Sequence, residues 1–216
     1  ATDAIEYYLT QDAGYDEVMI DFMGGEPMLA FPLIKRIVEY VTSRKQSKNY
    51  GFCMSTNGTL FNEESRAWFK EHKRIITPML SFDGTKIAHD MNRSKSFDQV
   101  EANIAFLKES WPLQGFKMTV NNRSLPHLAD GVFSVLARGC TLDLNLVHED
   151  VWGKGREKRK HLRTLEYELA RLVDFYTEFP TLEPPNLVSL PIIKCITKDT
   201  DHSAPWCGAG DAMVAV

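Results

Sequence analysis

Residues 20–31 read "IDFMGGEPMLAF", and this stretch decides the fold. It opens with apolar residues typical of a buried strand and stops on Gly24 and Gly25, which Glu26 and Pro27 follow. Two adjacent glycines allow another molecule to come close to the backbone, and a neighbouring carboxylate can hold a cation. The stretch therefore predicts a strand that ends at a ligand site.

Similar apolar runs recur along the chain and alternate with helical patterns. The candidate strands are residues 18–23, 52–55, 75–82, 116–120 and 142–147. Apolar residues three and four positions apart predict helices over residues 33–41 and 97–107, and another of about five turns over residues 162–176. Strands that alternate with helices indicate a parallel sheet, because parallel neighbours need crossover connections. The fold class is therefore α/β, as a barrel, a partial barrel or an open sheet.

Local signals mark the starts of three helices. Pro32 suits a first helical turn, and residues 96–99, "SFDQ", have the pattern of a capping box. Residues 153–163, "GKGREKRKHLR", form a basic cluster that fits a phosphate or an acidic peptide. Such runs are usually solvated helix starts, and that is the favoured interpretation here.

The composition excludes several classes of protein. The chain has 216 residues, 44% hydrophobic and 25% charged, as in an ordinary globular protein. Its formal net charge of -4 argues against a general binder of nucleic acid or of anionic membranes. No targeting signal is visible at the start, so a cytoplasmic location is expected. The four cysteines are widely spaced, which indicates neither a zinc ribbon nor a disulfide framework.

Polar and glycine-rich segments follow each predicted strand. The carboxyl ends of parallel strands meet at one edge of the sheet, where ligands bind in folds of this class. Turns also favour Gly, Asn, Asp and Ser, so any one segment has a purely structural interpretation. Their shared edge favours a functional face. The segments are residues 24–27, 55–59, 81–84, 121–124 and 148–150.

Four motifs, in this order, resemble the radical S-adenosylmethionine (SAM) enzymes, specifically the SPASM-type group of peptide and protein maturases, which is similar to the anaerobic sulfatase maturases. The motifs are "GGEP" at 24–27, "STNGTLF" at 55–61, "SFDGTKIAHDMNR" at 81–93 and "CGAGDAMVAV" at 207–216. The resemblance implies a partial (β/α) TIM-like barrel of the radical SAM type over residues 1–182. It also implies a linker and the beginning of a SPASM extension over residues 183–216.

The resemblance further implies which residues hold SAM. In the family, the segment that matches residues 24–27 holds the amino group of the methionine moiety. Ser81 and Asn57 would face the nucleoside or the methionine part, and Arg93 would pair with the methionine carboxylate. The implied cofactor-binding residues are Gly24, Gly25, Glu26, Pro27, Asn57, Ser81 and Arg93.

The implied chemistry is reductive cleavage of SAM by a 4Fe-4S cluster, giving a 5'-deoxyadenosyl radical that abstracts hydrogen from a peptide or protein substrate. An electron donor such as ferredoxin or flavodoxin is implied, and neither nucleic acid nor a membrane is expected as a partner. The family's C-x3-C-x2-C cluster ligands are absent, so we expect them upstream of Ala1 and expect this fragment alone to be inactive. Cys207 and Cys195 are candidate ligands of an auxiliary 4Fe-4S cluster, whereas Cys53 and Cys140 look structural.

Three alternatives remain open at this point. Sulfatase maturases carry an acidic residue just before the extension, whereas residues 186–195, "NLVSLPIIKC", hold none, which favours modification of a ribosomally made peptide. A second alternative is a cluster-free scaffold that kept the barrel and binds peptides. A third is a hydrolase that uses Glu26, Asp83 and His148 at the strand ends.

Overall fold

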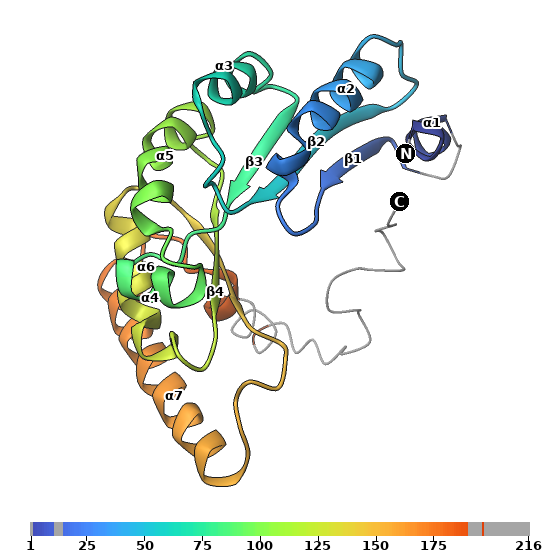
Figure 1. The fold of residues 1–216 in the computed structure, drawn as a ribbon. Coiled ribbons are helices and arrows are strands. Elements are labelled where there is room, and N and C mark those ends of the chain that lie inside the picture. The colour runs from blue at the N-terminus through green and yellow to red at the C-terminus, as the bar shows by residue number, and fades with distance from the viewer. Residues whose placement is uncertain (1, 11–14, 190–195, 197–216) are drawn as a thin grey trace.

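The computed structural model describes residues 2–10, 15–189 and 196, so the predictions for Cys195 and Cys207 lie outside the described residues. Strands and helices alternate along the chain, as the sequence predicts (Figure 1). The strands are β1 (Glu17–Phe22), β2 (Asn49–Thr56), β3 (Ile76–Leu80), β4 (Phe116–Val120) and β5 (Leu142–Leu146). The helices are α1 (Thr2–Thr10), α2 (Phe31–Thr42), α3 (Glu63–Glu71), α4 (Lys86–Asn92), α5 (Phe97–Ser110), α6 (Leu128–Ala137) and α7 (Gly155–Glu178). Short 3₁₀ turns, η1 (Pro27–Ala30) and η2 (Leu125–His127), precede α2 and α6.

The strands run parallel and follow one another in sequence order. β1, β2 and β3 pair in that order, and β4 pairs with β5. An isolated bridge between Ser81 and Lys117 joins the two groups, and Phe82 donates its backbone N–H to the Lys117 carbonyl at 2.9 Å. The predicted α/β class with parallel strands is confirmed, and the carboxyl ends of the strands meet along one edge.

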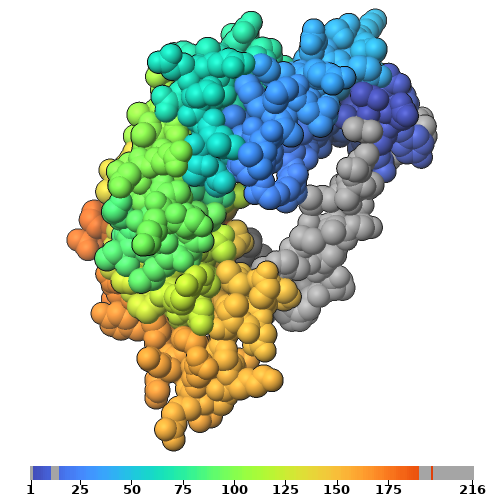
Figure 2. Space-filling model, viewed as in Figure 1, coloured from blue at the N-terminus to red at the C-terminus, as the bar shows by residue number. Residues whose placement is uncertain are grey.

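The two faces of the sheet differ in polarity. Alternate residues of a strand point to opposite faces. One face packs against the helices, and on it Phe52 and Met118 are at most 2% exposed. On the other face, Cys53, Ser55 and Lys117 are half-buried, and Asp143 and Asn145 of β5 are exposed. Figure 1 shows α3 to α7 along the left of the molecule, and Figure 2 shows a hollow on the other side, between the blue and the yellow-orange parts of the chain. We call this polar side the concave face.

One predicted helix start is confirmed and another is wrong. Pro32 lies in the first turn of α2, as expected. The capping box at 96–99 does not form, because the tight turn after α4 uses the Ser96 hydroxyl as a donor to the Arg93 carbonyl at 2.7 Å. The Asp90 carboxylate accepts from the Phe97 backbone N–H at 3.0 Å instead. An acid from the preceding helix therefore replaces the local cap.

The last helix is longer than its apolar stripe. α7 spans 24 residues because the basic cluster forms its first turns, with Lys and Arg side chains exposed as a solvated helix start requires. Within the segment expected to begin the linker and extension, Asn186 Oδ1 accepts from the Leu144 backbone N–H at 2.8 Å. The chain therefore returns to β5 just after residue 185.

None of the described helices has the length and apolar character needed to cross a membrane.

Candidate functional site

The segment after β1 is held in place by the Glu26 carboxylate. Its Oε1 accepts from the Met28 backbone N–H at 3.1 Å and from Thr56 Oγ1 at 2.7 Å. Its Oε2 accepts from the Asn57 backbone N–H at 2.7 Å. The carboxylate therefore caps η1 and ties the end of β1 to the end of β2. Since a carboxylate oxygen can accept two hydrogen bonds, Oε2 keeps one acceptor position for a ligand.

Gly24 and Gly25 present bare, exposed backbone between β1 and η1. Gly24 has a φ of 152°, a conformation that favours glycine. Gly25 lies outside that region, and a Cβ added to it would meet no atom within 4 Å. Neither backbone conformation nor packing among the described residues requires a glycine at position 25. The missing side chain leaves the backbone there open to a ligand.

Asn57 and Ser81 lie at the neighbouring strand ends. Ser81 donates its backbone N–H to the Thr56 carbonyl at 2.9 Å, so the segments after β2 and β3 are in contact. Asn57 Oδ1 accepts from the Thr59 backbone N–H at 2.9 Å and from its hydroxyl at 2.8 Å, which leaves the Asn57 side-chain nitrogen as a donor. The structure therefore brings Glu26, Asn57 and Ser81 together at the carboxyl ends of β1 to β3.

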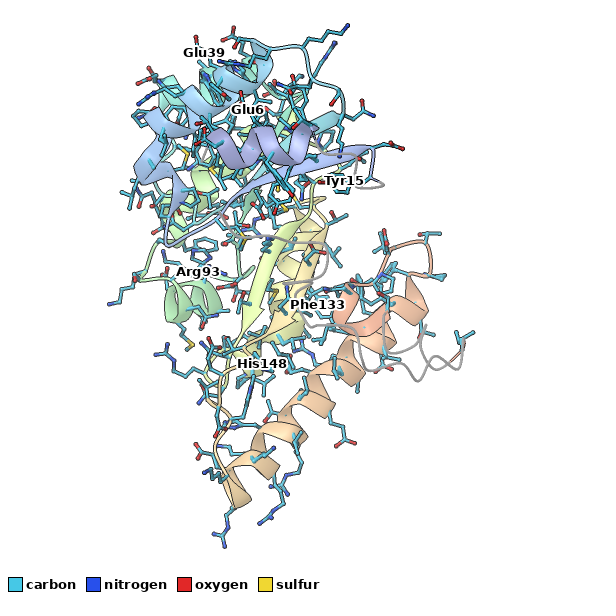
Figure 3. All side chains as sticks on the ribbon, turned by 90° about the vertical axis from the view of Figure 1, so that its right-hand side faces the viewer. Glu6, Tyr15, Glu39, Arg93, Phe133 and His148 are labelled. Carbon is cyan, nitrogen blue, oxygen red and sulfur yellow. The ribbon has the colours of Figure 1, made fainter. Side chains whose placement is uncertain are left out.

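Arg93, at the end of α4, pairs with Asp83. Its Nε and Nη2 donate to the two carboxylate oxygens of Asp83 at 2.8 and 3.1 Å. Asp83 is fully buried and also accepts from the Thr119 backbone N–H at 3.0 Å and from Asn92 Nδ2 at 3.2 Å. Four donors therefore fill the carboxylate. Figure 3 shows Arg93 at the left edge of the view, and its contact with the methionine carboxylate stays a prediction.

His89 completes this network from within α4. Its Nδ1 accepts from the Asp83 backbone N–H at 3.3 Å, and its Nε2 lies 3.1 Å from Ser96 Oγ. Burial lowers the pKa of His89, although the nearby Asp83 carboxylate opposes the shift. The neutral ring is the form that fits, because Nδ1 must be unprotonated to accept. His89, Asn92 and Arg93 of the third motif thus hold the turn after β3 to the start of α5.

Lys117 lies on the concave face and was missed by sequence reasoning. Its Nζ donates to Ser55 Oγ at 2.7 Å, so it extends from β4 across β3 to β2. The available signal is the strand "FKMTV" itself, in which Lys takes one of the positions that alternate with buried apolar residues. A charged side chain at such a position points away from the hydrophobic core, to the face of the sheet where a ligand can bind.

Asp21 and Cys53 are neighbours on the same face, paired in register on β1 and β2. Burial raises the pKa of Cys53 to about 12, and the Asp21 carboxylate adds to the shift. Burial also raises the pKa of Cys140, so both thiols stay neutral near pH 7, in line with structural roles. Among the described residues, no group of three or more His, Cys, Asp or Glu is placed to hold a metal ion.

The hydrolase alternative does not fit this geometry. It requires Glu26, Asp83 and His148 to act on one substrate from the strand ends. Asp83 is 0% exposed and its carboxylate is filled by four donors, so it cannot contact a substrate.

Comparison with known proteins gives matches to part of the chain. No family model matches the sequence. An uncharacterized protein of Methanocaldococcus jannaschii is 31% identical over 144 residues, covering 64% of this chain and 48% of that protein. A cysteine-type anaerobic sulfatase-maturating enzyme of Clostridium novyi is 29% identical over 119 residues, covering 52% of this chain and 31% of that enzyme. The chain spans about half or less of these curated relatives.

Solved structures of an anaerobic sulfatase-maturating enzyme share the fold. The structure with bound AdoMet and Kp18Cys peptide has a TM-score of 0.65 at 20% identity, covering 82% of this chain and 52% of that one. The resemblance to the radical SAM maturases is confirmed. The structure with bound AdoMet has a TM-score of 0.62 at 21% identity, covering 77% of this chain and 48% of that one. These radical SAM relatives bind the cofactor that the motifs imply, since AdoMet is SAM.

Proposed function

We propose that this chain forms the cofactor-binding part of a radical SAM maturase, which starts from SAM and modifies a side chain of a peptide or protein. The observation that carries the proposal is the open backbone at Gly25, beside Glu26, Asn57 and Ser81 at the strand ends. Relatives with AdoMet and a peptide bound support it.

The glycine segment fits the ammonium group of SAM. Close approach of a ligand explains why position 25 lacks a side chain, since nothing in the described residues demands a glycine there. The backbone carbonyls of Gly24 and Gly25 and the remaining position on Glu26 Oε2 are acceptors, as an ammonium group requires. Pro27 begins η1 and has no backbone N–H, so it adds no competing donor.

Lys117 is the cation that we assign to the methionine carboxylate. Arg93, which the resemblance implies for this role, uses two of its donors on Asp83. Lys117 is bridged to Ser81 through the backbone, and its ammonium group contacts a neutral hydroxyl of Ser55. A flexible ammonium group in that position can turn toward a carboxylate. On this assignment Arg93 positions the turn after β3 rather than the cofactor.

SAM and a 4Fe-4S cluster supply the one-electron chemistry of this enzyme class when bound. The chain's own residues bind and orient SAM: acceptors after β1 hold its ammonium group, and donors of Asn57 and Ser81 face its polar atoms. The C-x3-C-x2-C ligands are not in this sequence, so the proposal takes the cluster ligands from outside it. Cys195 and Cys207 remain the proposed ligands of an auxiliary cluster in a SPASM extension that starts at residue 183.

The proposed substrate is a ribosomally made peptide, bound on the concave face of a partial barrel, with ferredoxin or flavodoxin as electron donor. Sulfatase maturation is the second candidate, because the relatives with assigned names are sulfatase-maturating enzymes. The acid-free stretch 186–195 favours the first candidate.

A Gly25→Ala variant tests the proposal. The added Cβ meets nothing in the chain, so the free energy of unfolding should stay the same or rise by up to about 1 kcal/mol. SAM affinity, measured by calorimetry on an anaerobically reconstituted longer protein that includes the cluster ligands, should fall about tenfold or more, which corresponds to about 1.4 kcal/mol. Formation of 5'-deoxyadenosine should fall with it.

Gly139→Ala is the matched control. Gly139 has a φ of 66°, so Ala there should cost about 1–2 kcal/mol of stability and leave SAM affinity unchanged. Unchanged SAM affinity in Gly25→Ala would refute the proposal.

A further inference from the structure

An apolar pocket that the chain does not fill lies between the end of β5 and the start of α7. It has a volume of about 180 Å³ and is lined by Leu125, Leu146, Trp152, Leu162 and Leu165, with Lys158 and His161 completing the wall. An apolar cavity of about 150 Å³ holds a benzene ring, so this one has room for one large apolar side chain. We call it the α7 pocket. It lies at the carboxyl ends of β4 and β5, the same edge of the sheet as the proposed SAM site.

The α7 pocket is preformed because Trp152 is fixed at two points. Its Nε1 donates to the Val147 carbonyl at 3.0 Å. Its own carbonyl accepts from His161 Nδ1 at 2.8 Å, since a carbonyl can only accept. Leu162 is 54% exposed, so apolar surface on the pocket wall still faces solvent. A ligand side chain that enters gains burial without reordering the site.

A dense cluster of cations surrounds the α7 pocket. Residues 154–163 carry six Lys or Arg side chains and a single acid, Glu157, in a chain whose net charge is -4. All six cationic residues are exposed, and within the part of the chain that the structure describes none of them forms an ion pair with an acid. Figure 3 shows nitrogen-tipped side chains projecting from the lower end of α7. The cations are Lys154, Arg156, Lys158, Arg159, Lys160 and Arg163.

Helix stability does not explain this placement. The amino end of a helix carries partial positive charge and favours acids. α3 follows that rule, with Asn62 as a capping residue and Glu63 and Glu64 in its first turn. α7 opposes it, because Lys154 makes no side-chain cap and cations dominate the first turns. The helix dipole therefore does not account for the cations at the start of α7.

We propose that the α7 pocket and the cations at 154–163 together dock an acidic peptide segment. One aromatic or large aliphatic side chain enters the pocket, and carboxylates on either side of it lie against the start of α7. The inference rests on the proposed function, because it takes the docked peptide to be the substrate of the maturase. It adds that this substrate is acidic and carries one large apolar anchor residue. The solvated helix start described above is thus also a recognition surface.

A peptide matches this surface better than a membrane or a nucleic acid does. The exposed Leu162 and Tyr167 lie about 140° apart around α7, and Val173 shares the side of Leu162 but lies about three turns away, so the exposed apolar residues form no continuous face for a bilayer. The negative net charge of the chain repels nucleic acid at long range. The indole of Trp152 lines the pocket rather than offering an open stacking platform.

Fluorescence anisotropy with short labelled peptides tests the inference. The probe peptide has one Phe flanked on both sides by Glu. Two control peptides replace that Phe by Ser or the Glu residues by Lys. The purified chain should bind the probe about tenfold more tightly than either control peptide. Raising the salt concentration from about 0.1 M to about 1 M should weaken binding, because the screening length falls from about 10 Å to about 3 Å.

Two variants separate the roles of charge and pocket. Arg156→Glu with Lys160→Glu should weaken the probe about tenfold or more. Leu162→Ser should weaken the Phe probe and leave the Ser peptide unchanged. Lys45→Glu with Lys73→Glu makes the same change of charge at exposed sites near α2 and α3, and should have little effect. Circular dichroism melting curves establish that each variant is folded.

Three results would overturn the inference. One is equal binding of the Phe and Ser peptides, another is no effect of the charge reversals in folded protein, and the third is tighter binding to an oligonucleotide or to phosphatidylserine vesicles than to the probe. SAM affinity is measured for the same variants in a reconstituted longer protein that includes the cluster ligands. Peptide docking without SAM binding would refute the proposed function and leave the docking surface standing, and the converse holds as well.

Discussion

Two motifs that both carry the resemblance to radical SAM enzymes differ in how many of their polar groups are paired within the chain. In the turn after β3, Asp83 is fully buried and Arg93, Asn92 and the backbone of Thr119 fill its carboxylate. After β1, by contrast, Gly25 has no internal reason to be a glycine and its backbone faces open space. On the proposed function, the closed motif serves as scaffold and the open one as the binding site. A shared motif therefore indicates a family, whereas the hydrogen-bond partners of each residue in the structure indicate its role.

Removing the centre of the closed motif should have the largest effect. Asp83→Ala leaves the Arg93 guanidinium, with a side chain only 20% exposed, without its carboxylate. Breaking a buried pair in this way costs about 3–5 kcal/mol, which urea unfolding measures. Asp143→Ala, at an exposed position of β5, is the control and should change stability by no more than about 0.5 kcal/mol. A loss below about 1 kcal/mol for Asp83→Ala would contradict the scaffold role.

Replacing each of the two candidate cations in turn should have an effect of intermediate size and should show which motif binds SAM. Lys117→Met keeps an unbranched side chain of similar length on the concave face and removes the charge. Loss of a hydrogen bond to a charged group costs about 1.5–3 kcal/mol, so SAM affinity should fall by about tenfold to a hundredfold with stability little changed. Arg93→Met should show the reverse pattern, since it strips Asp83 of two donors. If Arg93→Met alone lowers SAM affinity in folded protein, the assignment to Lys117 is wrong.

The pH dependence of stability should give the smallest effect. Because burial lowers the pKa of His89 in the folded state, the unfolded chain takes up a proton first as the pH falls. The contribution of His89 is complete above pH 6.5, its ordinary pKa, and is lost as the pH falls toward the folded value. The slope from this group is at most about 1.4 kcal/mol per pH unit. Urea unfolding between about pH 7 and pH 5 should show it, and His89→Gln should flatten the profile in that range.

The sequence predicted most elements because their patterns are local. All five predicted strands occur, and the helices at 33–41, 97–107 and 162–176 correspond to α2, α5 and α7. The capping box at Ser96 failed because Asp90, from the preceding helix, supplies the cap. Lys117 was missed for a similar reason, since only the strand order brings it to Ser55. Local sequence patterns do not show which side chain from another element will form a given hydrogen bond.

The sequence by itself determined the parallel α/β class, the strand ends that carry the polar segments, and the resemblance to radical SAM enzymes. The class and the strand ends follow from residue periodicity and turn residues, which act within a few residues, whereas the resemblance rests on the four motifs. Only the tertiary structure decided that Asp83 and Arg93 satisfy each other while Gly25 stays open. It also decided that Leu125 and Leu146 meet the basic start of α7 around a pocket. Burial and pairing also depend on segments far apart in the chain, such as β4, whose Thr119 completes the partners of Asp83, and for that reason they require the folded molecule.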